Sequence, residues 1–187
     1  MKLWLTGYRN YEMNIFQPTD RRIKILRELI KEQLQEKIYN GLEWLLIGGE
    51  PGIEQWGAEA GIALKKSEPS LKIALMLPYK KFGNRWKPER QDQLSQLKSQ
   101  VDFVGEVSQQ SYTSPQQLRN WQQFMLKHTD EALMIYDLQY TGKSQYAYQA
   151  IKRYQDSNDY NLDLLDMDWL EVSSQDYLTE NTEKDLQ

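Results

Sequence analysis

The stretch Trp44-Leu45-Leu46-Ile47-Gly48-Gly49-Glu50-Pro51-Gly52-Ile53-Glu54 (residues 44–54) decides the fold class of this 187-residue chain. Its first four residues are continuously apolar, which is typical of a strand that is covered on both faces, as in a parallel sheet. The paired glycines end the strand, and Gly52 precedes a segment, 53–66, that has the composition of a helix. The stretch therefore predicts a strand, a glycine-rich turn and a helix, the repeating unit of an α/β protein.

The same alternation of short apolar segments and longer amphipathic segments continues on both sides of this stretch. Because strands separated by helices favour right-handed βαβ units, we predict a three-layer Rossmann-like α/β fold with a mostly parallel sheet of about six strands. The chain shows no internal repeat and no linker, so we expect one domain over 1–187 with a weakly structured acidic tail from about residue 168. The expected strands are 2–6, 44–47, 72–77, 101–107, 132–136 and 162–167, and the expected helices are about 20–39, 53–66, 89–100, 114–128 and 144–154.

Local signals predict where several helices begin and end. Thr19 or Asp20 can cap the first helix, and Asn40-Gly41 can end it. Ser114-Pro115-Gln116-Gln117 combines a serine cap, proline at the first helical position and glutamine at the third, which is a strong signal for a helix start.

Composition excludes several classes of chemistry. The chain has no cysteine and a single histidine, His128, so disulfides, a thiolate nucleophile and cysteine-based metal sites are excluded. We expect no metal, no membrane segment and a cytoplasmic protein, and we interpret His128 as a surface or capping residue. Residues 156–187 contain ten Asp or Glu and one Lys, and the whole chain carries −4, which leaves about +5 on residues 1–155. A mildly basic body suits an anionic ligand, and the acidic tail disfavours nonspecific binding of nucleic acid.

Glycine-rich segments after the strands are the candidate binding sites, because ligands of open parallel sheets bind beyond the carboxyl ends of the strands. Gly48 and Gly49 let a ligand approach the backbone, and Gly52 opens a helix whose free amides and dipole suit a phosphate. Glu54, in the first turn of that helix, can stabilise the dipole or accept hydrogen bonds from ribose hydroxyls. A tight strand-to-helix turn without a ligand is the alternative. The spacing is not G-x-G-x-x-G, so a standard NAD site is not expected.

Residues after other strands extend the predicted site. Thr6-Gly7-Tyr8-Arg9 offers a hydroxyl, a bare backbone, an aromatic ring and a guanidinium. Thr141-Gly142-Lys143-Ser144 invites comparison with a P-loop, but Asp137 stands where that motif needs glycine, so we exclude a P-loop. Gly142 and Ser144 then indicate either a second ligand-facing helix start or a simple cap. Trp86 can stack on a base or pack on a helix. The site requires Gly7, Gly49 and Gly52 to face one anion-sized hollow.

Four segments of the chain carry a combined pattern: the opening strand with Thr6-Gly7-Tyr8, and residues 41–60, 112–115 and 132–137. In this order they resemble the YpsA family of Firmicutes, and the resemblance spans nearly the whole chain. It implies a Rossmann-like domain of the superfamily (SLOG) that includes the DNA-processing protein DprA and the LOG-type phosphoribohydrolases. It also implies that Gly52 and Glu54 are the family's glycine–glutamate pair at the ligand site, and that Thr6, Gly7, Gly48 and Gly49 are its phosphate-facing turns. The LOG pattern Pro-Gly-Gly-x-Gly-Thr-x-x-Glu is not kept after Gly49.

Three functions follow as expectations. The first is a regulatory protein that binds a nucleotide-derived ligand. The resemblance implies that this ligand is ADP-ribose-like, NAD-like or a nucleoside phosphate, and that the protein has a role in growth, cell division or stress and a protein partner in cell division. The second is an N-glycosidic hydrolase of nucleotides, in which Glu54 would steady the ribose while Asp137 or Glu50 handles the water or the developing charge. The third is DprA-like binding of single-stranded DNA, which we do not expect because no basic stripe interleaved with aromatics is visible. No cofactor besides such a ligand is implied, and homo-oligomerisation is left open.

Overall fold

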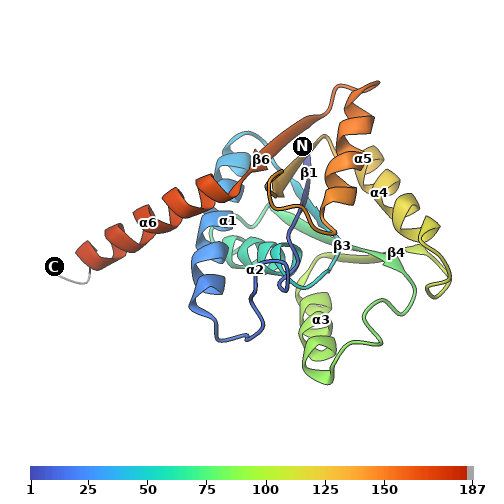
Figure 1. Ribbon diagram of the computed structural model, residues 1–187, viewed down its shortest axis with the longest axis horizontal. Helices are drawn as coiled ribbons and strands as arrows, with labels where there is room; N and C mark the ends of the chain where they lie inside the picture. Colours follow the sequence, from blue (N-terminus) through green and yellow to red (C-terminus); the bar gives the residue numbers. More distant parts are fainter. Residues whose placement is uncertain (185–187) are drawn as a thin grey trace.

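The computed structural model describes residues 1–184 and contains a sheet of six strands in the order β4-β3-β2-β1-β5-β6 (Figure 1). Every neighbouring pair is parallel. Helices cover both faces of the sheet, so the predicted three-layer Rossmann-like α/β fold is confirmed. The strands are β1 Lys2–Gly7, β2 Trp44–Ile47, β3 Lys72–Tyr79, β4 Phe103–Ser108, β5 Glu131–Ile135 and β6 Asn161–Leu165.

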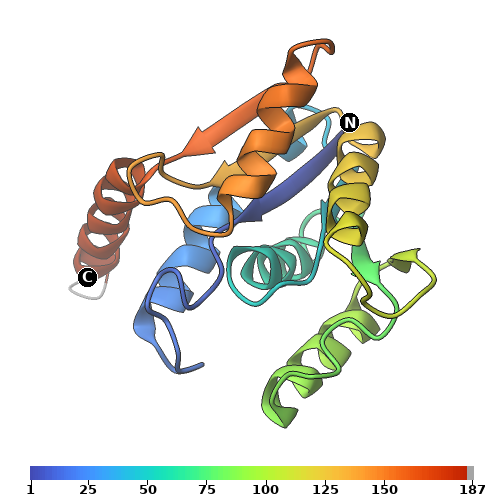
Figure 2. The same cartoon turned by 45° about the vertical axis from the view of Figure 1, so that its right-hand side comes forward.

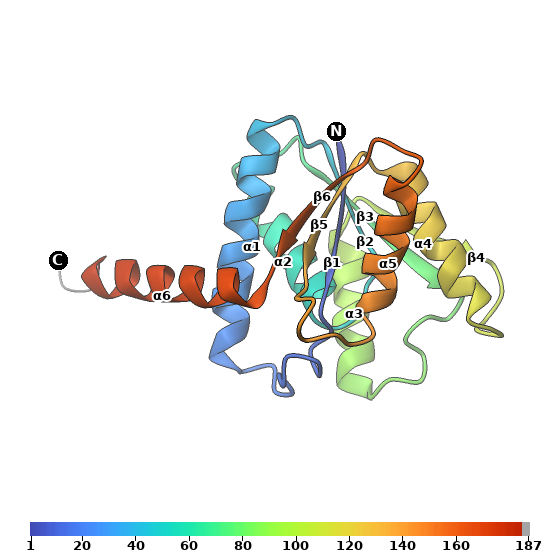
Figure 3. The same ribbon diagram turned by 45° about the horizontal axis from the view of Figure 1, so that its top comes forward.

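The helices divide between the two faces according to the direction in which the chain crosses the sheet. α1, α2 and α3 pack side by side on one face, while α4 and α5 pack together on the other (Figures 2 and 3). Right-handed crossovers impose this division, because the chain steps from β1 outward to β4 and then returns to β5 on the other side of β1. The helices are α1 Arg21–Tyr39, α2 Ile53–Leu64, α3 Pro88–Gln100, α4 Gln116–His128, α5 Gln145–Gln155 and α6 Met167–Lys184.

Helix α6 replaces the weakly structured tail that we expected from about residue 168. The Asp166 carboxylate accepts a hydrogen bond from Trp169 N at 2.8 Å, which caps the helix, and Leu170 is buried near its start. The helix packs against α1 at that end and then projects away from the sheet (Figure 1). The part of the predicted tail at 185–187 lies outside the described residues.

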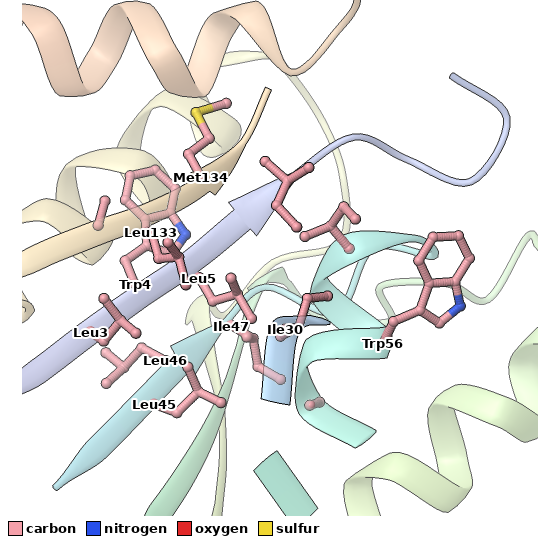
Figure 4. Packing of buried hydrophobic residues seen from close by; sticks show 14 of the residues in the cluster. Leu3, Trp4, Leu5, Ile30, Leu45, Leu46, Ile47, Trp56, Leu133 and Met134 are labelled. Atoms are coloured by element: carbon pink, nitrogen blue, oxygen red, sulfur yellow. The ribbon is translucent and has the colours of Figure 1, made fainter. Parts of the chain in front are cut away.

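The core is built around β1, which pairs with β2 on one side and with β5 on the other. Leu3, Trp4 and Leu5 are fully buried, because successive side chains of this central strand point to opposite faces and helices cover both (Figure 4). The Trp4 ring meets Trp121 of α4 edge to face, with the ring centroids 5.7 Å apart. Among the described residues, no helix is long and apolar enough to cross a membrane.

Two helix starts show how the local signals work. Asp20 is the N-cap of α1, and its carboxylate accepts from Arg22 N at 3.0 Å. The start of α4 is where the sequence predicts it, but the mechanism differs: Pro115 is the N-cap and the Ser114 side chain makes no capping bond. Instead the Gln117 side chain reaches back, and its Oε1 accepts from Thr113 N at 2.7 Å and Ser114 N at 3.2 Å.

Candidate ligand-binding site

A cavity of about 590 Å³ opens at the carboxyl ends of β1, β2 and β3, beside the start of α5. Strand order reverses between β1 and β5, and the crevice at such a reversal is where open α/β sheets bind ligands. The lining comes from the strand ends and from α2, α4 and α5: Thr6, Gly7, Arg9, Gly48, Glu50, Glu54, Pro78, Tyr79, Phe82, Tyr112, Pro115, Leu118, Arg119, Trp121, Gln122, Lys143, Ser144, Tyr146, Ala147 and Arg153.

Glu54 forms the inner end of the cavity from the first turn of α2, with only 4% of its surface exposed. Its Oε1 accepts from Thr6 Oγ1 and its Oε2 accepts from Glu50 N, both at 2.9 Å. Burial raises the pKa of Glu54 to about 7, and the neighbouring Glu50 charge acts in the same direction, while the two hydrogen bonds oppose it. This carboxyl group can therefore hold or release a proton near neutral pH.

Glu50 and Arg9 form an ion pair beside Glu54, with Arg9 Nη2 and Glu50 Oε1 3.3 Å apart. Burial raises the pKa of Glu50, and the positive charges of Arg9 and Lys143 counteract that rise. The side chains remain 25% and 31% exposed, so a ligand that enters the cavity can reach both. The inner end therefore presents two carboxyl groups and one guanidinium.

Aromatic side chains form much of the cavity wall. Trp121 donates from Nε1 to Met76 O at 2.7 Å, which fixes its ring over Gly48. A Cβ at position 48 would lie 2.4 Å from the Trp121 ring, so only glycine fits there without a shift. Tyr79 packs against Phe82 and Tyr112, with centroids 5.3 and 5.1 Å away. Trp121 is thus both a core residue, as expected from its place on α4, and part of the site wall.

The start of α5 closes the cavity on the β5 side through Ser144, which Glu12 holds in place from behind the lining. Ser144 Oγ lies 2.9 Å from Gly7 O and 2.9 Å from Glu12 Oε2, two acceptors for its one proton. Glu12 also accepts from Lys143 N at 2.6 Å and from Arg9 N at 2.7 Å. This carboxylate therefore ties the loop after β1 to the first turn of α5.

Gly49 and Gly52 do not line this cavity. A Cβ on Gly49 would meet the side chains of Leu75 and Leu77, so its free face points into the apolar interior. Gly52 has φ +123°, and a Cβ there would lie 2.5 Å from Tyr8 O, because the loop after β1 lies against it. Of the three glycines required to face one hollow, only Gly7 does so, joined by Gly48, so the prediction of one anion site formed by all three turns is wrong.

Four other predicted residues also lie outside the cavity. The Tyr8 hydroxyl is held by Asp137 N at 2.9 Å and donates to Tyr140 O at 2.7 Å, and burial raises its pKa to about 12. The Asp137 carboxylate accepts from Gln139 N and from Met167 N at the start of α6. Trp86 packs edge to face on Phe82, and Gly142 lies against Glu12. Their contacts are those of structural residues.

The structure thus brings together seven of the residues singled out from the sequence: Thr6, Gly7, Arg9, Gly48, Glu50, Glu54 and Ser144. Sequence reasoning missed the site roles of Glu12, Tyr79, Phe82, Arg119 and Arg153. Tyr79 could have been identified from the sequence, because it is the last residue of β3 and therefore lies at the same edge of the sheet as Thr6. Glu12 and Arg153 carried no local signal, because only the tertiary fold brings them to this edge. Among residues that the structure describes, no group of three or more His, Cys, Asp and Glu side chains could hold a metal ion.

A parallel sheet with a polar cavity at the carboxyl ends of its central strands defines a Rossmann-like α/β protein. Within that class, the chain belongs to the YpsA family: the model of this family, described as the YspA SLOG family, matches residues 3–170.

Proteins from lactic acid bacteria are similar along nearly the full chain. A UPF0398 protein of Levilactobacillus brevis is 49% identical over 94% of this chain and 93% of its own length. One from Leuconostoc citreum is 45% identical over 99% and 98%.

A solved structure is similar in fold. DNA processing protein A of Helicobacter pylori, described for its single-stranded DNA binding mode, matches with a TM-score of 0.53 and 14% identity over 97% of this chain and 81% of its own. At that identity the likeness shows the fold alone.

Replacing Glu54 by glutamine should remove a pH dependence of stability. The folded chain holds the Glu54 proton up to a pKa of about 7, while an exposed glutamate loses it near 4.5. Protonated Glu54 contributes its full stabilisation below the pKa that it has in the unfolded chain. This contribution is lost as the pH rises through the pKa that Glu54 has in the folded chain. Between about pH 5 and pH 8, wild type should therefore lose about 3 kcal/mol of unfolding free energy relative to Glu54→Gln. Urea denaturation across this range measures the difference.

The exposed exchange Glu180→Gln is the control for the loss of one negative charge, and its stability should follow wild type at each pH. If the unfolding free energies of wild type and Glu54→Gln changed in parallel with pH, Glu54 would be ionised like an exposed glutamate.

Substituting Gly52 by alanine should destabilise the chain more than the same change at Gly41. Both glycines have positive φ, but a Cβ at Gly41 meets nothing within 4 Å, whereas one at Gly52 meets backbone atoms of Tyr8 and Asn10. We expect a loss of about 1 kcal/mol for Gly41→Ala and about 2–4 kcal/mol for Gly52→Ala. Chemical denaturation compares the two, and equal losses would contradict the close approach.

Proposed function

We propose that the chain binds a nucleotide-derived ligand, ADP-ribose-like, NAD-like or a nucleoside phosphate, in the cavity at the ends of β1, β2 and β3. One observation carries the proposal: the same cavity has carboxyl groups at its inner end, aromatic walls and arginines in its outer part. Carboxylates accept hydrogen bonds from ribose hydroxyls, aromatic rings pack on a base, and guanidinium groups bind phosphate. Its volume of about 590 Å³ lies within the usual range for small-molecule sites.

The regulatory role in growth, cell division or stress, and a protein partner in cell division, are part of the same proposal and rest on the family resemblance. The cavity supports this view because its ligand-facing groups belong to three separate chain segments. Thr6 lies near the end of β1, Glu50 follows β2 and Ser144 caps α5, so a ligand that bridges them would change how firmly the segments hold together.

Isothermal titration calorimetry against ADP-ribose, NAD, AMP, adenosine and a single-stranded oligonucleotide tests the proposal. We expect at least one of the nucleotides to bind, and Glu54→Gln to weaken it about tenfold or more, because glutamine replaces one of the two carboxyl oxygens with an NH2 group that cannot accept a hydrogen bond. Glu180→Gln, an exposed exchange on α6, should leave the affinity unchanged. Binding of the oligonucleotide alone would replace the proposal with the DNA-binding alternative, and no binding at millimolar ligand would refute it.

A second candidate is hydrolysis of the N-glycosidic bond of a nucleotide, and the pKa of Glu54 is the observation that favours it. A carboxyl group with a pKa of about 7 beside a second carboxyl group is suited to give or take a proton at neutral pH. In the reaction the bond from C1′ to the base breaks, the water oxygen bonds to C1′, and its proton leaves with the base. Glu50 and Glu54 can serve here, whereas Asp137 does not line the cavity.

Chromatography of AMP or NAD after incubation with the protein tests this candidate. The hydrolase candidate predicts release of free base with a pH profile that turns near 7, and a loss of activity of about 100-fold or more in Glu54→Gln. Intact nucleotide after prolonged incubation at high protein concentration would exclude the hydrolase and leave the binding proposal in place.

A further inference from the structure

The helices α2 and α5, which both begin at the cavity, do not offer free N-termini to a phosphate. At the start of α2, Glu54 and Glu50 place two carboxyl groups on the cavity side, and Ile53 N already donates to Tyr8 O at 3.0 Å. A phosphate that approached α2 would meet these two carboxyl groups before it met an amide. The glycine-rich turn that predicts a phosphate site from sequence is therefore an acidic end of the cavity.

The start of α5 is closed in a different way. Glu12 Oε1 lies 2.6 Å from Lys143 N and 3.4 Å from Ser144 N, and Glu12 Oε2 lies 2.9 Å from Ser144 Oγ. A Cβ on Gly142 would lie 2.1 Å from Glu12 Oε1, so the carboxylate fits closely against this turn. Glu12 thus takes the place that an oxygen of a bound anion takes at other helix N-termini.

The basic residues of the cavity fall into two pairs. Arg9 and Lys143 lie near Glu50 and offset its charge. Arg119 of α4 and Arg153 of α5 line the outer part of the cavity, and neither has an acidic partner among the residues that the structure describes. Within residues 1–184, Arg119 makes one hydrogen bond, from Nε to Gln116 Oε1 at 2.9 Å, and its two terminal nitrogens have no partner there.

The outer part of the cavity is a groove between α4 and α5, which lie side by side on one face of the sheet (Figure 2). The groove continues the cavity away from Glu50 and Glu54 and is lined by Leu118, Arg119 and Gln122 of α4 and by Tyr146, Ala147 and Arg153 of α5. The cavity therefore has carboxyl groups at one end and arginines at the other. A ligand with hydroxyl groups at one end and phosphate at the other fits it with the hydroxyl groups toward Glu54 and the phosphate toward the arginines.

We infer that the phosphate of the ligand lies in the groove between α4 and α5 and is bound by the side chains of Arg119 and Arg153, and not by the amides of either helix N-terminus. The inference rests on the proposed function and adds the direction in which the ligand enters. Guanidinium groups suit this task because they bind phosphate with two parallel N–H donors. The hydroxyl-bearing end then meets Glu54 and Glu50.

A pair of matched double variants tests the inference. Arg119→Ala/Arg153→Ala removes one cation from α4 and one from α5 inside the groove. Lys127→Ala/Lys152→Ala removes one from each of the same helices at exposed positions that do not line the cavity. All four residues are exposed, so both proteins should fold, and their melting temperatures verify this.

Titration with ADP-ribose, AMP and adenosine separates the phosphate from the rest of the ligand. We expect the arginine double variant to bind ADP-ribose or AMP about 10- to 100-fold more weakly than wild type, and adenosine with an affinity within about twofold of wild type. The lysine double variant should bind all three ligands as wild type does. Higher salt should shrink the difference between AMP and adenosine in wild type and not in the arginine variant.

Two results would overturn the inference while the proposed function stands. The first is that the wild type binds AMP or ADP-ribose and the arginine double variant binds the same ligand with equal affinity. The second is that Glu12→Ala binds AMP more than about tenfold tighter than the wild type does, while its affinity for adenosine is unchanged. That result would mean that the phosphate competes with Glu12 for the start of α5. A wild type that binds none of the three ligands overturns the proposed function and, with it, the inference.

Discussion

The burial of β1 on both faces is the constraint on which the rest of the structure depends. Leu3, Trp4 and Leu5 are fully enclosed, and the strand is hydrogen-bonded to β2 and β5 at once. A strand so placed has no freedom to shift its register, because a slip of one residue would exchange its two buried faces. Its end is therefore a fixed point, and Thr6 and Gly7 can hold Glu54 and Ser144 at hydrogen-bond distance.

The fold could be predicted from the sequence because its signals are local. The run 44–47 is apolar throughout and ends in two glycines, and the structure has a strand and a turn there. The helix starts at Asp20 and Pro115 are likewise determined by a few neighbouring residues. The tail after residue 168 was misjudged, because its acidic composition resembles a frayed terminus while the cap at Asp166 decides the outcome.

The candidate site could be predicted only in part, because its chemistry depends on which faces the turns present. Glycine is needed at position 52 to let the loop after β1 lie close, and the sequence alone cannot distinguish that need from close approach of a ligand. Glu12 is separated from Ser144 by more than a hundred residues, so no spacing rule connects them. The sequence also does not show that Glu54 is buried. Burial raises its pKa to about 7, which distinguishes it from an exposed glutamate in the first turn of a helix.

The contact between Gly48 and Trp121 has a consequence for how sequences of this kind diverge. The indole ring and the Glu54 carboxylate fill the space that a side chain at position 48 would occupy, and the indole N–H donates to Met76 O. A larger residue at 48 is therefore compatible only with a smaller one at 121, and that smaller residue would leave the β3 carbonyl without its donor. The two positions are expected to change together, so that covariation between them would mark relatives whose cavity has been reshaped.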